Sequence, residues 1–224
     1  MACRIDILSI GTLSRNRIWK ETTAVRTPHA TTSLIRAGGR VILVDPGLPA
    51  PVQVARLFER TGLRPDAVDT VFLTTFRPAH REGLAAFEHA TWLIHDAERD
   101  AVAEHLGDLR DRGDDEIRST VSRELDLLER FQSPEDKLAD QVDLFPLPGY
   151  TPGTCGLLIT EPTTTTLVAG DAVPTRDHLL AGQVLADPFN NAQAQESLRE
   201  AYEIADVIVP GHDNLFQNPR HYGV

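Results

Sequence analysis

The chain has 224 residues, 41% of them hydrophobic, which is enough to bury a substantial core, and we expect one domain over residues 1–224. Its 33 acidic residues outnumber 22 basic ones and give a formal net charge of -11, which argues against nucleic acid or anionic lipid as a partner. Two distant cysteines, no signal-peptide pattern and no run near the roughly 18 apolar residues that span a bilayer predict a cytoplasmic protein with neither a disulfide framework nor a membrane segment.

Short apolar and β-branched runs predict strands in both halves of the chain. They lie at residues 5–10, 31–36, 41–45, 70–74 and 91–95, and again at residues 141–147, 155–160, 165–171 and 206–211. Helical spacing of apolar residues predicts an amphipathic helix over residues 50–62 and another over residues 192–205. Between them, the highly charged stretch 96–131 carries a partial apolar stripe, and we expect two helices joined at Gly113. Strands that alternate with helices in this way indicate an α/β fold.

The informative polar residues follow the predicted strands. Asp45 ends the third strand in VDPG, and the segment TTFRPAH follows the fourth and ends at His80. In the second half, Asp171 closes AGD and His212 closes VPGH. Active sites in layered α/β folds collect at such strand ends, because the strands hold the loops in place while the loops vary. The sequence therefore places the candidate site among these loops.

Five motifs in the same order resemble those of the metallo-β-lactamase superfamily, and together they cover nearly the whole chain. They are TTSLIRAGGRVILVDPGLP, VFLTTFRPAHREGL, LPGYTPGTCGLLI, LVAGDAV and VIVPGH. The resemblance implies the four-layer αββα sandwich of that superfamily, a mixed α/β architecture, and it makes a homodimer a reasonable expectation. It also implies a site at the strand ends that holds metal ions for hydrolysis.

The superfamily builds two adjacent metal sites that share one aspartate, and the resemblance assigns each of their ligands a position in this chain. Three positions keep a ligand residue: His80, Asp171 and His212. Four have lost it: Thr75, Arg77, Ala79 and Tyr150. The first site thus keeps only the shared Asp171, whereas the second loses only the ligand at Ala79. Two imidazoles and one carboxylate suffice for one zinc, or one iron, with open positions, and a site without metal is the alternative.

Arg77 falls where the first site has a histidine, and this raises a separate hypothesis. A guanidinium is a permanent cation with five hydrogen-bond donors. We therefore expect an Arg77–Asp171 ion pair in place of the first metal; the alternative has Arg77 facing solvent. Such a pair would also weaken metal binding at the second site, because the guanidinium competes for the carboxylate and repels a dication.

Two further residues receive expected roles. The resemblance implies that Asp45, in the turn VDPG, supports the first loop by accepting hydrogen bonds from backbone donors. Tyr150 has two interpretations. Its phenol acts beside Asp171 in catalysis by donating to a developing oxyanion or by binding the metal as tyrosinate, or its ring merely fills the space of the lost imidazole.

Other histidines and one long connection complete the set of candidates. His95 is expected either to cap a helix or to lie at a solvated strand end. His29 and His178 show no paired ligand spacing and are assigned to the surface or to loops. The connection 172–191 follows the shared aspartate, and its length is typical of a functional lid or an interface.

Two classes of function follow from these observations. The first is a divergent hydrolase that acts on a small ester, thioester or lactone through one metal ion at His80, Asp171 and His212. The second is a metal-free pseudoenzyme that uses the cleft to bind a small molecule or a protein. A small-molecule ligand is expected in either case, and convergence of the retained ligands in space distinguishes the two classes.

Overall fold

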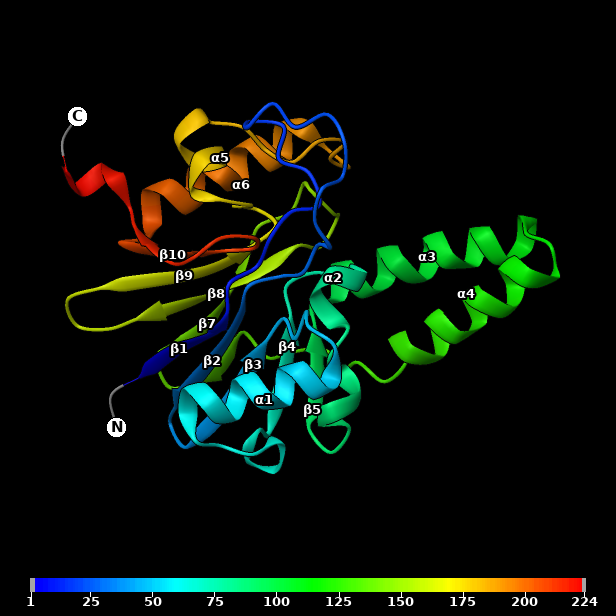
Figure 1. Cartoon of the computed structure of the whole chain (residues 1–224), viewed down its shortest axis with the longest axis horizontal. Coiled ribbons are helices and arrows are strands. Elements are labelled where there is room, and N and C mark those ends of the chain that lie inside the picture. The colour runs from blue at the N-terminus through cyan, green and yellow to red at the C-terminus, as the bar shows by residue number, and fades with distance from the viewer. Residues whose placement is uncertain (1–2, 223–224) are drawn as a thin grey trace.

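Two β-sheets lie face to face in the computed structural model, which describes residues 3–222 and the side chains of residues 3–220 (Figure 1). The first sheet has the order β1-β2-β3-β4-β5 and consists of β1 (Arg4–Ser9), β2 (Thr32–Ala37), β3 (Arg40–Val44), β4 (Thr70–Leu73) and β5 (Thr91–Ile94). Neighbours among β1, β2 and β3 are antiparallel, whereas β4 runs parallel to both β3 and β5. The strands predicted in the first half of the chain are confirmed.

The second sheet has the order β11-β10-β9-β8-β7-β6. It consists of β6 (Lys137–Ala139), β7 (Val142–Pro146), β8 (Cys155–Thr160), β9 (Thr165–Gly170), β10 (Val207–Pro210) and β11 (Phe216–Gln217). β9 and β10 are parallel, and the other neighbouring pairs are antiparallel. The strands predicted here are confirmed, but β6 and β11 were not predicted, because strands of 3 and 2 residues are too short to show an alternating pattern.

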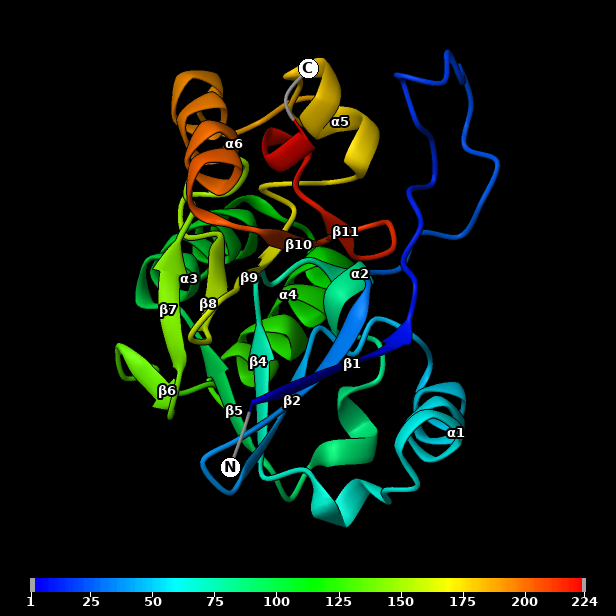
Figure 2. The same cartoon turned by 90° about the vertical axis from the view of Figure 1, so that its left-hand side faces the viewer.

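Helices cover the outer face of each sheet and complete the four αββα layers expected from the sequence (Figures 1 and 2). α1 (Ala50–Thr61) covers the first sheet, while α5 (Arg176–Ala181) and α6 (Asn191–Ile204) cover the second. Between the sheets, Phe72 of β4 and Leu157 of β8 belong to one buried apolar cluster. Short helical turns lie at α2 (Pro78–Arg81), Pro65–Ala67, Leu84–Phe87 and Pro219–Tyr222. No helix in the described part of the chain is long and apolar enough to cross a bilayer.

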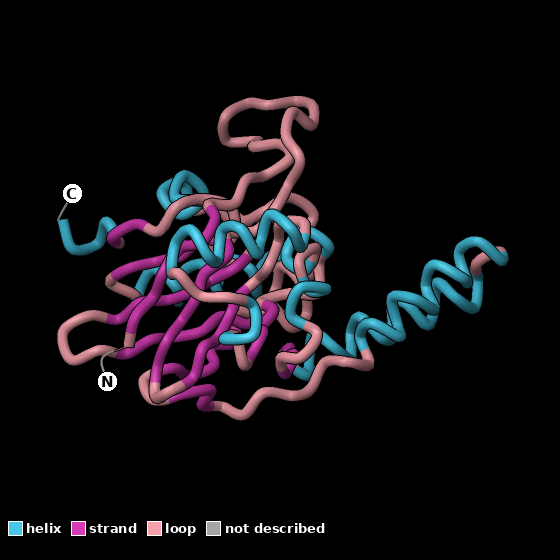
Figure 3. Tube along the Cα trace, turned by 60° about the horizontal axis from the view of Figure 1, so that its bottom comes forward, coloured by secondary structure: helices cyan, strands magenta, loops and turns pink. Residues whose placement is uncertain are grey.

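α3 (Asp96–Arg112) and α4 (Asp115–Leu128) form a helical hairpin that projects from the sandwich (Figures 1 and 3). α3 ends at Gly113, and the Asp114 side chain caps α4 by accepting a hydrogen bond from the Ile117 backbone N–H. The predicted division at Gly113 is therefore confirmed. The base of the hairpin is anchored in the core, where Leu128 is 3% exposed, whereas Leu109 near its tip is 41% exposed.

Residues that follow the parallel strands of both sheets meet at one edge of the sandwich, and this positions the candidate site. Asp45 follows β3 and Thr74 follows β4, while Asp171 and His212 follow β9 and β10. Gly170 has a φ of 53°, and a Cβ added there would lie 2.4 Å from Thr74 Oγ1. Only glycine fits at this position, since it adopts the left-handed conformation and allows the second sheet to approach the first.

The hairpin provides a matched test of where the core lies. Leu128→Ala should lower the free energy of unfolding by about 2–5 kcal/mol, because it leaves a cavity at a fully packed position. Leu109→Ala makes the same chemical change at an exposed position and should cost about 0.5 kcal/mol or less. Urea denaturation followed by circular dichroism measures both values, and equal losses would contradict the assignment of the core.

Candidate functional site

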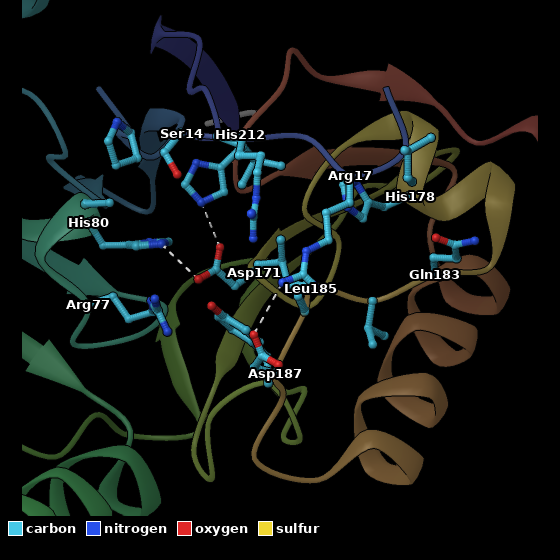
Figure 4. A pocket seen from close by; sticks show the side chains of 18 of the residues that line it. Ser14, Arg17, Arg77, His80, Asp171, His178, Gln183, Leu185, Asp187 and His212 are labelled. Atoms are coloured by element: carbon cyan, nitrogen blue, oxygen red, sulfur yellow. Dashed lines mark hydrogen bonds and ion pairs between the residues drawn. The ribbon is translucent and has the colours of Figure 1, made fainter. Parts of the chain in front are cut away.

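The strand-end loops of the two sheets bring His80, Asp171 and His212 together inside the protein (Figure 4). His80 lies in α2, which begins at Pro78, a residue whose fixed φ suits the first position of a helix. All three side chains are buried. One potential ligand atom of each residue lies within 4.8 Å of those of the other two. The three retained ligand positions, distant in sequence, thus converge in space.

Asp171 lies between the two imidazoles. His212 Nε2 is 2.9 Å from Asp171 Oδ1, and His80 Nε2 is 3.3 Å from Asp171 Oδ2. The two rings are nearly perpendicular, with an interplanar angle of 83° and centroids 5.6 Å apart. Although His80 Nε2 is buried, it makes no hydrogen bond within the described residues. It instead faces the Asp171 carboxylate at ion-pair distance, an interaction that requires His80 to be protonated.

The other ring nitrogen of each histidine faces an oxygen acceptor. His80 Nδ1 lies 3.0 Å from Asp45 Oδ2, and His212 Nδ1 lies 3.0 Å from the backbone carbonyl oxygen of His29. Histidines that bind metals usually donate their second ring N–H to a carboxylate or a carbonyl, which fixes the ring and directs the other nitrogen toward the ion. Two such Nε2 atoms and one carboxylate therefore form a donor set that fits a single divalent cation.

Asp45 holds the His80 side of the site. Its Oδ1 accepts a hydrogen bond from the Thr74 backbone N–H at 2.9 Å, and its Oδ2 accepts one from Thr74 Oγ1 at 2.7 Å. Its backbone has a φ of 50°, in the left-handed region that non-glycine residues seldom adopt. Buried hydrogen bonds keep this conformation in place, so Asp45 fixes both the loop after β4 and the ring of His80.

The charged side chains of this group shift each other's pKa strongly. Burial would lower the pKa of His80, but the carboxylates of Asp45 and Asp171 outweigh burial and raise this pKa to about 10. Burial would likewise raise the pKa of Asp171, but His80 and His212 hold that pKa well below its usual range. The group therefore binds a proton tightly on His80, and a cation that binds here must displace that proton.

A cavity of about 580 Å³ opens beside these residues. Its walls include residues 13–15, 17–18, 77–79 and 183–187. The connection from β1 to β2 lies beside α5 (Figure 2), and Trp19 Nε1 donates a hydrogen bond to Asp177 Oδ2 at 2.6 Å. The sequence had singled out the connection 172–191, part of which lines the cavity. It did not indicate the β1–β2 connection, which has neither a motif nor a periodic pattern.

The family model of the metallo-β-lactamase superfamily matches residues 26–212. The chain belongs to this superfamily. The match spans the strands of the first sheet from β2 onward and ends at His212, so it includes all the residues that converge at the site. No curated protein matches the chain.

Solved structures of the superfamily share the fold at low sequence identity. A Thermotoga maritima protein assigned to the metallo-β-lactamases is 19% identical, with a TM-score of 0.70 over 97% of this chain and 100% of its own. An N-acyl homoserine lactone hydrolase with its product N-hexanoyl-L-homoserine at the catalytic metal centre is 18% identical, with a TM-score of 0.64 over 94% and 92%. The dizinc quorum-quenching lactonase AidC is 14% identical, with a TM-score of 0.63 over 78% and 67%.

Two of the superfamily positions without a ligand residue hold groups that make other contacts. Thr75 is buried, and its Oγ1 donates a hydrogen bond to Glu98 Oε1 at 2.7 Å. Ala79 lines the cavity, and its backbone carbonyl accepts a hydrogen bond from the Ala30 N–H at 2.8 Å. Thr75, a first-site position, has its hydroxyl bound to Glu98, and Ala79, a second-site position, has no side-chain donor atom, so neither side chain supplies a metal ligand.

The expected Arg77–Asp171 ion pair is wrong. Within the described residues, the ion pairs of Asp171 are with His80 and His212, so each of its two oxygens already faces an imidazole. Arg77 is exposed, and its guanidinium carbon lies 4.9 Å from the centroid of the Tyr150 ring, a cation–π geometry. The guanidinium therefore does not compete for Asp171, and the expected weakening of metal binding loses its basis.

Tyr150 lines the cavity and keeps its proton over the physiological range. Burial and the negative charge of Asp171 raise the pKa of Tyr150 to about 12, although the neighbouring Arg77 acts in the opposite direction. A neutral phenol is a hydrogen-bond donor, whereas a tyrosinate would be a ligand. The site thus has a neutral O–H group near the three potential metal ligands.

Glu98 of α3 ties the two halves of the molecule together beside the site, and sequence reasoning missed it. Its Oε1 accepts from Thr75 Oγ1 at 2.7 Å and from the Phe76 N–H at 3.0 Å, and its Oε2 accepts from Thr151 Oγ1 at 2.6 Å and from the Gly153 N–H at 3.2 Å. The side chain is 1% exposed. In the sequence it is one of many acidic residues in a charged helix, so no signal could have distinguished it.

Two further histidines have defined positions in or beside helices. The assignment of His178 to the surface or a loop is wrong, because it lies buried in α5, lines the cavity and contacts Thr175 Oγ1 through Nδ1 at 2.8 Å. Burial lowers the pKa of His178 to about 4, and the neighbouring His212 acts in the same direction. His95 caps α3 by accepting a hydrogen bond from the Ala97 N–H at 3.2 Å, one of its two expected roles.

Glu98→Gln should destabilise the protein, because the amide can accept at only one end and leaves buried donors facing its NH₂ group. The expected loss in the free energy of unfolding is about 1–3 kcal/mol for each donor left unpaired. Glu104→Gln, on the exposed side of the same helix, should change stability by about 0.5 kcal/mol or less. Urea denaturation measures both, and an unchanged Glu98→Gln variant would show that this carboxylate does not hold the loops.

The raised pKa of His80 predicts how the stability of the chelator-treated protein depends on pH. Its folded-state pKa of about 10 exceeds the unfolded value of about 6.5. The stabilisation is therefore fully present below about pH 6.5 and is lost as the pH rises toward about 10, since the unfolded chain releases its proton first. Urea denaturation across this range measures the loss, which His80→Gln should abolish; parallel pH profiles for the two proteins would contradict the assignment.

Proposed function

We propose that this protein is a hydrolase that uses a single divalent cation, zinc or iron, held by His80, Asp171 and His212. The observation that carries the proposal is the pairing of the two histidines. Each has its Nδ1 directed at a fixed oxygen and its Nε2 directed toward Asp171, so that three donor atoms converge beside a cavity. The buried His80 Nε2 is one of these donor atoms, and it faces Asp171 Oδ2 at 3.3 Å without a well-aligned hydrogen bond.

The substrate class follows from the family and from the size of the cavity. Related structures include an N-acyl homoserine lactone hydrolase and a quorum-quenching lactonase, both of which act on a cyclic ester. A cavity of about 580 Å³ is in the range that accommodates small molecules. We therefore propose a small ester, thioester or lactone as the substrate.

Each residue of the site has a separate role in the proposed reaction. A cation held by His80, Asp171 and His212 would supply Lewis acidity and lower the pKa of a bound water molecule toward neutrality. Asp45 and the carbonyl oxygen of His29 fix the two histidine rings. Asp171 would hold the cation through one carboxylate oxygen and leave the other to accept a hydrogen bond from a water molecule. Its low pKa makes it a poor store for a proton. Tyr150 donates its O–H to the negative charge that develops on the carbonyl oxygen.

A single cation rather than two is proposed because the first-site positions do not supply ligands. Thr75 donates to Glu98, Arg77 is itself a cation, and Tyr150 keeps its proton. One cation retains Lewis-acid catalysis but lacks the second ion that stabilises both attacking and leaving oxygens in two-metal sites. Tyr150 and Arg77 occupy superfamily positions of the first site, where a second cation would otherwise supply positive charge.

A second candidate is a metal-free binding protein, and the network of charges favours it. With His80 protonated, its ring lies between the carboxylates of Asp45 and Asp171, at 3.0 and 3.3 Å. Opposite charges at these distances stabilise one another in a buried setting without a metal. The cavity would then serve for binding alone.

Metal content and hydrolysis distinguish the two candidates. Protein purified without a tag or strong chelator should contain about one equivalent of zinc or iron per chain, and it should hydrolyse members of a panel of esters, thioesters and lactones. His80→Ala and His212→Ala should lose both the metal and the activity. His105→Ala, an exposed histidine of α3, serves as the control that should keep both.

Elemental analysis by mass spectrometry measures the metal, and release of product measures hydrolysis. A protein that takes up neither zinc nor iron on reconstitution and cleaves no compound of the panel would contradict the hydrolase proposal. That result would support the metal-free candidate, and calorimetric screening for bound small molecules would be the next step.

A further inference from the structure

The cavity beside the candidate metal ligands is locally basic although the protein is acidic. Arg15, Arg17 and Arg77 line it, against Asp171 and Asp187. The whole chain carries a net charge of -11, so the positive charge of three arginines around one cavity is opposite in sign to the charge of the protein as a whole. Clefts lined by one sign of charge attract ligands of the opposite sign.

Two of these arginines already have partners. Arg17 forms an ion pair with Asp187 at 3.6 Å, as Figure 4 shows. The Arg15 guanidinium donates a hydrogen bond to the backbone carbonyl oxygen of Thr22 at 3.1 Å. Both contacts hold side chains of the cavity wall and reduce their capacity to bind an additional anion.

The guanidinium of Arg77 is different, because it has no acidic partner and no hydrogen bond within the described residues. Its contact is with the Tyr150 ring, whose centroid lies 4.9 Å from the guanidinium carbon. Figure 4 shows this side chain extending into the cavity on the same side as His80. Stacking on a ring restrains the plane of a guanidinium and leaves the N–H groups at its edge free to donate.

We propose that Arg77 binds a carboxylate of the substrate, so that the protein acts on small esters, thioesters or lactones that carry a carboxylate group. The statement about the substrate rests on the hydrolase function proposed above. Two N–H groups of a guanidinium match the two oxygens of a carboxylate in a planar, charge-assisted pair. Of the three arginines, Arg77 is the one whose guanidinium makes neither an ion pair nor a hydrogen bond within the described residues, so its N–H groups can pair with the two oxygens of one carboxylate.

The position of Arg77 gives this contact a role in orientation. Arg77 directly precedes α2, and the N–H of His80 donates a hydrogen bond to its backbone carbonyl at 2.9 Å. The anchor for the carboxylate and a potential metal ligand therefore belong to one rigid turn. A substrate held at Arg77 would place its ester or lactone carbonyl at a defined distance from the cation site, which favours reaction by limiting its freedom.

Binding of a compound that cannot be hydrolysed tests Arg77 independently of any enzymatic activity. N-methylsuccinamate carries a carboxylate and a stable amide, and N,N′-dimethylsuccinamide is its neutral counterpart. Ligand-observed NMR titrations of the metal-reconstituted full chain should show about 10- to 100-fold weaker binding of the neutral compound, the range expected for loss of hydrogen bonds to a charged group. Arg77→Gln should lose a similar factor for the anion and leave the neutral compound unaffected, and Arg77→Lys should recover part of the loss.

Two control variants separate a specific contact from the general field of positive charge. Arg60→Gln removes the same charge from the last turn of α1, outside the cavity, and should leave anion binding unchanged. Arg17→Gln removes a paired arginine of the cavity and should weaken binding less than Arg77→Gln does. Equal losses for Arg17→Gln and Arg77→Gln, or no loss for Arg77→Gln, would overturn the assignment.

Inorganic phosphate tests the choice of a carboxylate, and a pair of esters tests whether the bound anion is part of a substrate. Tighter binding of phosphate than of N-methylsuccinamate, with loss in Arg77→Gln, would overturn the choice of a carboxylate. Hydrolysis of monomethyl succinate should exceed that of dimethyl succinate in kcat/KM, and Arg77→Gln should remove the preference. If the anion binds through Arg77 but neither ester is cleaved, the anion site stands and the hydrolase proposal fails.

Discussion

The contact between the Asp45 carboxylate and His80 Nδ1, at 3.0 Å, is the interaction on which the rest of the site depends. Asp45 lies at the end of β3 in the first sheet, and its own conformation is held by the backbone and hydroxyl of Thr74 at the end of β4. Through this contact the first sheet directs His80 Nε2 toward Asp171, which belongs to the second sheet. The site therefore forms only where the two sheets pack together, and the distances between its side chains depend on that packing.

Glu98 of α3 joins the two halves of the molecule in another way. Its two oxygens bind the loop after β4 and the loop before β8, which carry the positions that hold first-site ligands in relatives of this superfamily. A carboxylate with donors on both oxygens can cross-link loops without a metal, because the donors neutralise its buried charge. The two loops are therefore held together by hydrogen bonds within the protein.

The remaining first-site positions give the cavity a new chemical character. Arg77 and Tyr150 stack on each other and present a fixed positive charge and a neutral O–H group beside His80 and Asp171. In a site with one cation, fixed charges of the protein can take over part of the electrostatic role of a second ion, since they need no reorganisation when the substrate binds.

The sequence by itself determined the layered architecture and the retained residues, because alternating apolar runs, helix ends such as Gly113 and short motifs at strand ends are local signals. It also located His80, Asp171 and His212, through their order in the superfamily motifs. It could not decide the contacts of Arg77, which the sequence paired with Asp171 and the structure places against Tyr150. Side-chain partners of this kind depend on orientation in space, as does the burial of His178 and of Glu98. Tertiary structure alone decided them, since it determines which acceptors are already occupied and which charged groups remain free.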